Sequence, residues 1–202
     1  MRETVIFGNW DGKPLEWLIL SDDGNALTLW CMNVIKVMPF SKEQCSAYYA
    51  ESDVRAFLEG EFYETAFSTK EKARIKDTEL DCTEYQTYYG AVGVGATDYR
   101  KEPLTTRVFL LSIREIMKTY ALTPEEIYHP SASMIWTRSP ESHKCVSLIN
   151  CSKDILSGRE NPYSYESRSY DHTTGMVDST TFPYFTFANS PSGVVPALRI
   201  AK

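Results

Sequence analysis

The stretch from His143 to Cys151 contains the residue types of a nucleophilic or redox site. His143 lies two residues before Cys145, and Cys151 follows six residues after Cys145. A Cys–His pair can produce a reactive thiolate. On a strand, however, positions two apart lie on the same face, so this spacing alone activates neither residue. We interpret the pair as a structural cysteine and a surface histidine and predict no catalytic residue. An enzyme that uses Cys145 or Cys151 is the alternative.

Two further groups contain residue types that bind metal ions. His143, Cys145, Cys151 and His172 could surround zinc, but their spacing matches no zinc finger or ribbon. Acidic residues of the segment 160–178 could hold calcium, although a solvated acidic loop explains them more simply: Glu160, Glu166, Asp171 and Asp178. The glycines at 90–95 lack the spacing and the strand-to-helix context of a phosphate-binding loop. We therefore predict no metal and no cofactor.

A polar segment from 157 to 183 has the composition of a binding surface. It is rich in Tyr, Ser, Thr, Asp and Asn, and loops of this length in a compact domain are usually functional or disordered. Its several aromatic residues favour order, because disordered segments contain few. Antibody loops use the same composition to bind proteins. The predicted recognition surface covers 157–192, with these ligand-binding residues: Tyr163, Tyr165, Arg168, Tyr170, Asp171 and Arg138.

Arg138 allows two interpretations. It stands near the end of an apolar run, Met134–Ile135–Trp136, just before Ser139 and Pro140. An arginine there can pair with a buried acid and hold the base of the following loop, or it can contact the ligand directly. We favour the first interpretation and keep the second.

The elements that must position these residues follow from apolar periodicity. Four runs in the first 38 residues predict an antiparallel meander: 5–7, 14–20, 26–32 and 34–38. Caps and 3.6-residue spacing predict helices at 53–62, 68–75, 113–120 and 123–126. Further apolar runs predict strands at 107–111, 134–136, 146–149, 184–187 and 194–198. The predicted fold class is α+β.

Length and charge limit the classes of function. The chain has 202 residues, of which 43% are hydrophobic, and we predict a single domain over 1–202. The net charge of −6, without a run of five like charges, argues against a nucleic-acid or membrane-surface partner. No apolar stretch approaches the ~20 residues of a membrane span. The five cysteines form no Cys-x-x-Cys, and the first residues contain no signal-peptide pattern. We expect a cytoplasmic protein with free thiols; a phage particle or a secreted form is the alternative.

Five short motifs carry a resemblance to known domains. They are FGNW from Phe7, PLEWLIL from Pro14, VFLLS from Val108, WTRSP from Trp136 and GVVPAL from Gly193. Together they resemble an uncharacterised bacterial domain family. The last two also resemble retroelement-diversified variable proteins.

The resemblance implies a C-type-lectin-like fold. In that fold the first and last strands pair, helices flank a mixed sheet, and long C-terminal loops form the binding face. The fold alone does not give the function. From the composition of 157–192 and the motifs that flank it, we predict a non-enzymatic domain that binds a protein or a glycan. Two alternatives stay open: an enzyme similar to formylglycine-generating enzymes or sulfoxide synthases that uses Cys145, Cys151 or a metal, and a structural subunit of a phage or cell-surface assembly.

Overall fold

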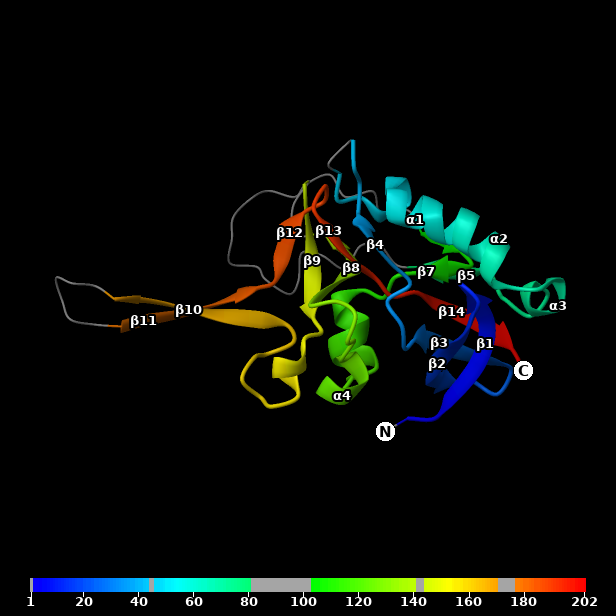
Figure 1. The fold of residues 1–202 in the computed structure, drawn as a ribbon, viewed down its shortest axis with the longest axis horizontal. Helices are drawn as coiled ribbons and strands as arrows, with labels where there is room; N and C mark the ends of the chain where they lie inside the picture. The colour runs from blue at the N-terminus through cyan, green and yellow to red at the C-terminus, as the bar shows by residue number, and fades with distance from the viewer. Residues whose placement is uncertain (1, 44–45, 81–102, 141–143, 171–176) are drawn as a thin grey trace.

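The protein folds into two five-stranded sheets, several short helices and one projecting hairpin, as the computed structural model shows (Figure 1). The structure describes residues 2–43, 46–80, 103–140, 144–170 and 177–202, with the backbone alone for 164–170 and 177–183. The fold class is α+β, as the sequence predicts.

The first sheet is antiparallel and contains the first and last strands of the chain. Its strands are, in spatial order, β1 (Thr4–Trp10), β2 (Lys13–Asp22), β3 (Ala26–Cys31), β14 (Ala197–Ala201) and β7 (Val108–Phe109). Asp11 and Gly12 connect β1 to β2 with φ angles of 50° and 74°. A two-residue hairpin turn of type I′ requires such positive φ angles. The predicted meander is confirmed for its first three strands.

The last strand has different neighbours than the resemblance implies. β14 pairs with β3 on one side and with β7 on the other, while β1 stays at the sheet edge. The expected pairing of the first and last strands is therefore wrong. The two short turns place β1, β2 and β3 side by side in chain order. β2 therefore lies on the inner side of β1, and the strand of this meander that is left to pair with β14 is β3.

The second sheet is mixed and lies beside the first (Figure 1). Its strands are, in spatial order, β12 (Phe185–Phe187), β9 (Cys145–Asn150), β8 (Met134–Pro140), β13 (Pro191–Val194) and β4 (Lys36–Pro39). The β13–β8 pair is parallel and the other three pairs are antiparallel.

Two predicted strands differ from the observed ones. The run 34–38 leads into β4 of the second sheet and does not extend the meander, and the predicted strand 194–198 divides into β13 and β14. Pro196 separates them because it has no N–H for a ladder, and its carbonyl accepts a hydrogen bond from Cys31 N at 2.9 Å. The segments β3–β4 and β13–β14 thus cross between the sheets together, linked by a bond of 3.0 Å from Ile35 N to Val194 O.

The helices begin where the sequence predicts. The main one is continuous through α1 (Asp53–Phe57), the π-helical turn η2 (Leu58–Phe62) and α2 (Tyr63–Ala66). Ser52 is its N-cap, since Ser52 Oγ accepts from Arg55 N at 3.1 Å. The remaining helical elements are η1 (Tyr49–Glu51), α3 (Thr69–Lys72), η4 (Glu115–Thr119), α4 (Pro124–Ile127) and η5 (Lys153–Ile155). Both α3 and α4 have a capping box.

Two small antiparallel pairs complete the fold. β5 (Thr78–Leu80) pairs with β6 (Leu104–Thr106). β10 (Ser164–Tyr170) pairs with β11 (Val177–Pro183) over seven residue pairs, and we call these two strands the arm. The arm projects far from the body of the molecule (Figure 1).

The prediction of a loop at 157–183 is wrong for the two strands of the arm. Tyr, Thr and Val favour extended backbone, but the segment lacks the alternation of apolar and polar residues that reveals a half-buried strand. Its backbone is therefore a hairpin without a sequence signal for one.

A single cluster of buried residues joins both sheets and the main helix. Three tryptophans are almost completely buried in it: Trp17, Trp30 and Trp136. Two of the indoles have hydrogen-bond partners, as buried indoles usually do: Trp17 Nε1 donates to Phe7 O at 2.6 Å and Trp136 Nε1 to Met38 O at 2.9 Å. The motif that contains Trp136 is thus anchored in the core at its first residue.

Candidate functional site

The predicted binding residues separate into two places. Tyr165, Arg168 and Tyr170 lie together on β10 of the arm. Asp171 falls outside the described residues. Tyr163 lies just before the arm and is half-buried, and its Oη donates to Leu122 O at 3.3 Å. Arg138 lies elsewhere, inside β8.

Arg138 connects β8 to the segment after β7 and to η4. Its guanidinium forms a bidentate ion pair with the Glu115 carboxylate and also donates to Leu110 O at 2.9 Å. Its side chain is 3% exposed. The same carboxylate accepts from Ser112 N at 2.7 Å and so caps the helical segment around η4. The geometry matches the first interpretation in that Arg138 pairs with an acid, Glu115; that it holds the base of the following loop stays a prediction.

The base of the arm is fixed by a buried asparagine at the end of β9. Asn150 is 1% exposed. Its Nδ2 donates to Glu160 Oε2 at 2.5 Å, and its Oδ1 accepts from Ser152 N at 2.9 Å. Its backbone N–H donates to Pro162 O at 2.8 Å. Asn150 therefore ties the segment that enters the arm to the second sheet.

Replacing Asn150 by alanine is expected to loosen this base. The variant loses three side-chain hydrogen bonds at a buried position, those with Glu160, Tyr184 and Ser152. The loss costs about 1–3 kcal/mol of unfolding free energy. Chemical denaturation measures the loss, and hydrogen exchange should show faster exchange at residues 150–163. Asn161→Ala is the matched control, because Asn161 is exposed and accepts one local bond from Tyr163 N. Equal losses for both variants would contradict the anchoring role.

Two exposed phenylalanines lie directly after the arm. Phe185 is 46% and Phe187 is 58% exposed on β12, which is an edge strand of the second sheet. Exposed aromatic residues on a sheet edge are typical of contact surfaces. The sequence predicts 184–187 only as an apolar strand and thus misses these two residues. Their alternation in Phe-Thr-Phe directly after a polar segment is the signal that could have found them.

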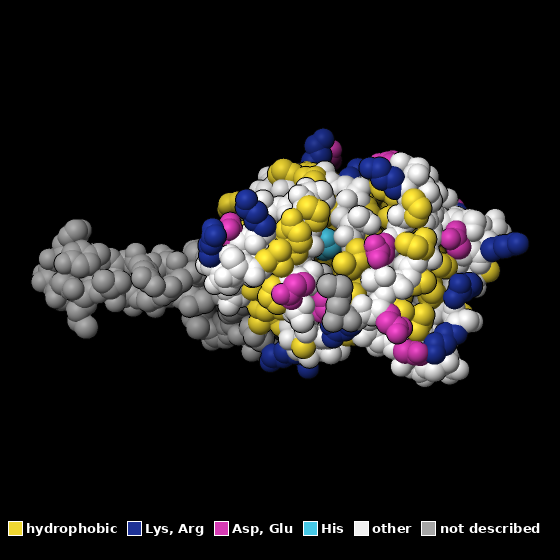
Figure 2. Space-filling view, turned by 60° about the horizontal axis from the view of Figure 1, so that its bottom comes forward, with side chains coloured by type: hydrophobic (Ala, Val, Ile, Leu, Met, Phe, Trp, Pro, Cys, Tyr) yellow, Lys and Arg dark blue, Asp and Glu magenta, His cyan; other side chains and the backbone are white. Residues whose placement is uncertain are grey.

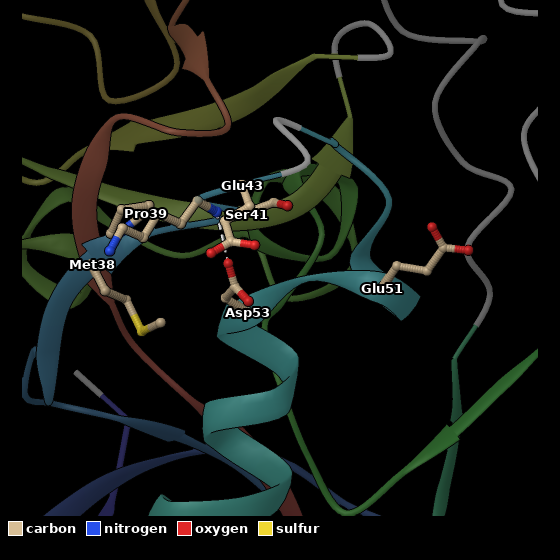
Figure 3. A pocket seen from close by; sticks show the side chains of 7 residues that line it. Met38, Pro39, Ser41, Glu43, Glu51 and Asp53 are labelled. Carbon is tan, nitrogen blue, oxygen red and sulfur yellow. Dashed lines mark hydrogen bonds between the residues drawn. The ribbon is translucent and has the colours of Figure 1, made fainter.

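Among the described residues, two cavities border the second sheet. The smaller, of about 300 Å³, lies between β4 and the start of α1 (Figure 3). It is lined by Met38, Pro39, Ser41, Lys42, Glu43, Glu51 and Asp53. Asp53 turns toward the backbone and accepts from Lys42 N at 2.6 Å, whereas Glu51 points away from the other acids (Figure 3). The acidic side chains that line the smaller cavity therefore do not converge on one point.

The larger cavity, of about 470 Å³, we call the sheet cavity. It is lined by Val37, Ser131, Ala132, Ser133, Met134, Leu148, Thr186, Pro191, Ser192 and Gly193. Each of the five strands of the second sheet contributes at least one of these residues. None of them is charged. The sequence offers no signal for this cavity, because its walls come from five separate segments.

Comparison with protein families assigns the chain. A family model described as a domain of unknown function, DUF6273, matches residues 16–201. The chain belongs to the DUF6273 family. The matched range contains the arm, β12 and both cavities of this DUF6273 domain. No curated protein and no solved structure matches the chain.

The two cysteines considered for chemistry in this DUF6273 domain are far apart. Cys145 begins β9 and Cys151 follows its last residue. Six residues of extended strand span roughly 20 Å, whereas a disulfide requires Cα atoms within about 7 Å. Burial raises the pKa of the Cys151 thiol to about 12, and its Sγ donates to Ala132 O at 3.2 Å. Cys151 is therefore a protonated, buried thiol rather than an activated nucleophile.

Metal ligands and charge give no further site in the described part of this DUF6273 domain. Among the residues that the structure describes, no three His, Cys, Asp or Glu side chains lie close enough together to hold a metal ion. His143 and His172 fall outside the described residues. On the face in Figure 2, the described Lys and Arg side chains lie mostly toward the margins, with acidic ones between them.

No helix among the described residues is long and apolar enough to cross a membrane.

Proposed function

We propose that this DUF6273 domain is a non-enzymatic binding domain that recognises a protein partner through the arm and β12. The observation that carries the proposal is the arm itself: a hairpin of seven residue pairs that projects from the body and leads directly into an edge strand with two exposed phenylalanines. An isolated hairpin is marginally stable in water. A partner that covers it would supply the missing contacts.

The chemistry of this surface favours a protein over other ligands. The strand edges of the arm and of β12 offer backbone N–H and C=O groups that an extended partner segment can pair with. Phe185 and Phe187 add apolar area, and the tyrosines of β10 belong to the residue type enriched in protein-binding surfaces. An ordinary interface buries roughly 1,600 Å² in total, about half of it on each partner.

The alternatives have less support. The enzyme alternative uses Cys145, Cys151 or a metal, and for Cys151 an activated thiol is disfavoured because burial raises its pKa to about 12. A structural subunit of a larger assembly would use the same arm to contact its neighbours, so it is a special case of protein binding. A glycan ligand is supported by a different part of the molecule, the sheet cavity.

The C-type-lectin-like architecture is also a proposal. A mixed second sheet, helices beside the sheets and a long excursion between β9 and β12 support it. The pairing of β14 with β3 in place of β1 differs from the arrangement that the resemblance implies. An experimental structure compared with known C-type-lectin-like domains would decide it.

Excision of the arm tests the proposed function. Tyr184 N donates to Tyr163 O at 3.4 Å, so an Asn-Gly turn can join these two residues in place of 164–183. We expect the excised chain to keep its thermal unfolding midpoint and to lose binding to a partner captured by the intact chain. The partner is identified by cross-linking in extracts of the source cells, then purified and titrated by calorimetry. An at least tenfold weaker affinity is the expected result.

A second variant separates β12 from the arm. Replacing Phe185 and Phe187 together by serine should weaken the same affinity at least tenfold. Ile6→Ser is the matched control, because Ile6 is 60% exposed on β1 of the other sheet. A partner that binds the excised chain as tightly as the intact chain would overturn the proposed function.

A further inference from the structure

The sheet cavity has the size and construction of a small-molecule site. Its volume of about 470 Å³ lies within the range of ligand pockets, roughly 300–1,000 Å³. Because all five strands of the second sheet contribute to its walls, the backbone of the cavity is held by the sheet ladder. The cavity is separate from the arm.

The floor of the cavity is packed to a fixed shape at Gly193. A Cβ atom on Gly193 would lie 3.1 Å from Met134 O, 3.1 Å from Val34 Cγ1 and 3.2 Å from Ala132 Cβ. These distances are tighter than ordinary contacts, so a larger residue would force the strands apart. Glycine here permits the close approach of β13 to the segment before β8.

Four side chains of the cavity have hydroxyl groups: Ser131, Ser133, Thr186 and Ser192. Ser192 is the buried one at 7% exposed, whereas Ser131 and Ser133 are exposed. A hydroxyl can donate one hydrogen bond and accept others, so a polar ligand in the cavity could exchange hydrogen bonds with these four groups.

The walls exclude two classes of ligand. No lining residue is charged, so a charged ligand would lose its hydration without gaining a counter-charge. A purely apolar ligand would cover the four hydroxyls and leave them unbonded, which costs their desolvation. The other lining side chains are apolar: Val37, Ala132, Met134, Leu148 and Pro191. The complementary ligand is uncharged, has several hydrogen-bonding groups, and has apolar patches between them.

We propose that the sheet cavity binds a neutral carbohydrate. A sugar ring has hydroxyl groups around its rim and C–H groups on its faces, which match the hydroxyls and the apolar walls. Each serine or threonine hydroxyl can donate one hydrogen bond and accept others, as a sugar hydroxyl does. This inference is independent of protein recognition by the arm.

A sugar panel tests the proposal on the purified full chain. Ligand-observed NMR is recorded with glucose, galactose, mannose, N-acetylglucosamine and maltose, and with glucuronate as the charged counterpart of glucose. We expect at least one neutral sugar to bind with a Kd in the millimolar range or tighter, and glucuronate to bind at least tenfold more weakly than glucose if glucose binds. Absence of binding by all five neutral sugars would overturn the proposal.

Variants locate the binding in the cavity. Ser192→Ala removes the buried hydroxyl and should weaken the sugar at least tenfold, and Ser133→Phe should abolish binding by filling the cavity. Ser157→Ala is the matched control, because Ser157 is exposed and lies outside the cavity. Thermal unfolding confirms that each variant is folded. Sugar binding that survives both cavity variants would overturn the assignment.

The arm-excised chain separates this proposal from the proposed function. It should keep the full sugar affinity while it loses the protein partner. Sugar binding that disappears with the arm would place the sugar on the arm and contradict the cavity assignment, whatever the outcome for the protein partner.

Discussion

Replacing Glu115 by glutamine is expected to lower the free energy of unfolding by about 3–5 kcal/mol, because it leaves a buried charge without a partner. The change keeps the size and shape of the side chain, removes its charge, and turns one of the two oxygens that accept from Arg138 into an NH2 donor. Arg138 is 3% exposed and pairs with both carboxylate oxygens of Glu115. Since arginine stays protonated inside proteins, its charge cannot be removed by a shift in pKa.

The expected loss is large relative to the whole. Small domains unfold with about 5–15 kcal/mol, so the variant would lose a substantial share of its stability. Glutamine can still accept a hydrogen bond from Arg138 and from Ser112 N. The loss therefore reports the charge rather than the cap of the η4 segment.

A double-mutant cycle distinguishes an uncompensated charge from lost packing. Arg138→Met with Glu115→Gln removes both charges, and the double variant should be more stable than Glu115→Gln alone. Arg159→Met is the matched control: Arg159 pairs with Asp154 at 3.6 Å but is 76% exposed. Such exposed pairs contribute about 0–1 kcal/mol. Equal effects of Glu115→Gln and Arg159→Met on denaturant unfolding would contradict the buried role of Arg138.

The sequence predicts helix starts and the first hairpin correctly, because both depend on interactions between residues close together in the chain. Ser52 and the Ser68–Glu71 pair marked helix starts because a cap is a contact between residues three apart. The first three strands were readable from the turn at Asp11-Gly12 and the apolar runs on either side of it. In both cases the sequence contains the complete local interaction.

Features that depend on distant contacts were not readable. Nothing near Arg138 identifies Glu115 as its acid, since the partner lies in another element of the fold. The sheet cavity arises only when five separate strands assemble. The division at Pro196 shows a local rule with a distant consequence: proline breaks the ladder, but which sheet each half joins depends on β3 and β4.

The strands of the arm were not predicted, for a different physical reason. Alternation of apolar and polar residues marks a strand because one face is buried. Among the described strands, β10 and β11 pair only with each other and belong to neither of the large sheets. Composition still indicated a binding surface, since Tyr and Ser are common in such surfaces whatever the backbone does. The binding function that this composition predicts stays a prediction.

Acid is expected to destabilise the protein through His129, and the loss should appear before the carboxylates titrate. His129 is 1% exposed, and its ring packs edge-on against Trp30 with centroids 5.4 Å apart. Nδ1 lies 3.1 Å from Met32 O. Because a carbonyl only accepts, Nδ1 carries the proton, and Nε2 has no hydrogen-bond partner among the described residues. The ring is therefore a buried neutral imidazole.

The sign of the effect follows from proton binding. Burial lowers the pKa of His129 from 6.5 to about 4, although the hydrogen bond to Met32 O opposes the shift. Between these two pKa values the unfolded chain binds a proton that the folded chain does not, so stability falls as the pH falls. From pH 7 to pH 5 this single group should lower the unfolding free energy by about 2 kcal/mol.

His129→Asn isolates this contribution. The Asn Nδ2 occupies the place of His Nδ1 and can still donate to Met32 O, but the side chain does not titrate. The variant is expected to be less stable at pH 7, because it loses the contact with Trp30, yet its stability should change by about 2 kcal/mol less between pH 7 and pH 5. Other histidines and the carboxylates cancel in this comparison, since both chains contain them. Denaturant unfolding at both pH values measures the difference. Identical pH dependence in the two proteins, or an NMR titration of His129 with a midpoint near 6.5, would show that the ring is not held neutral by burial.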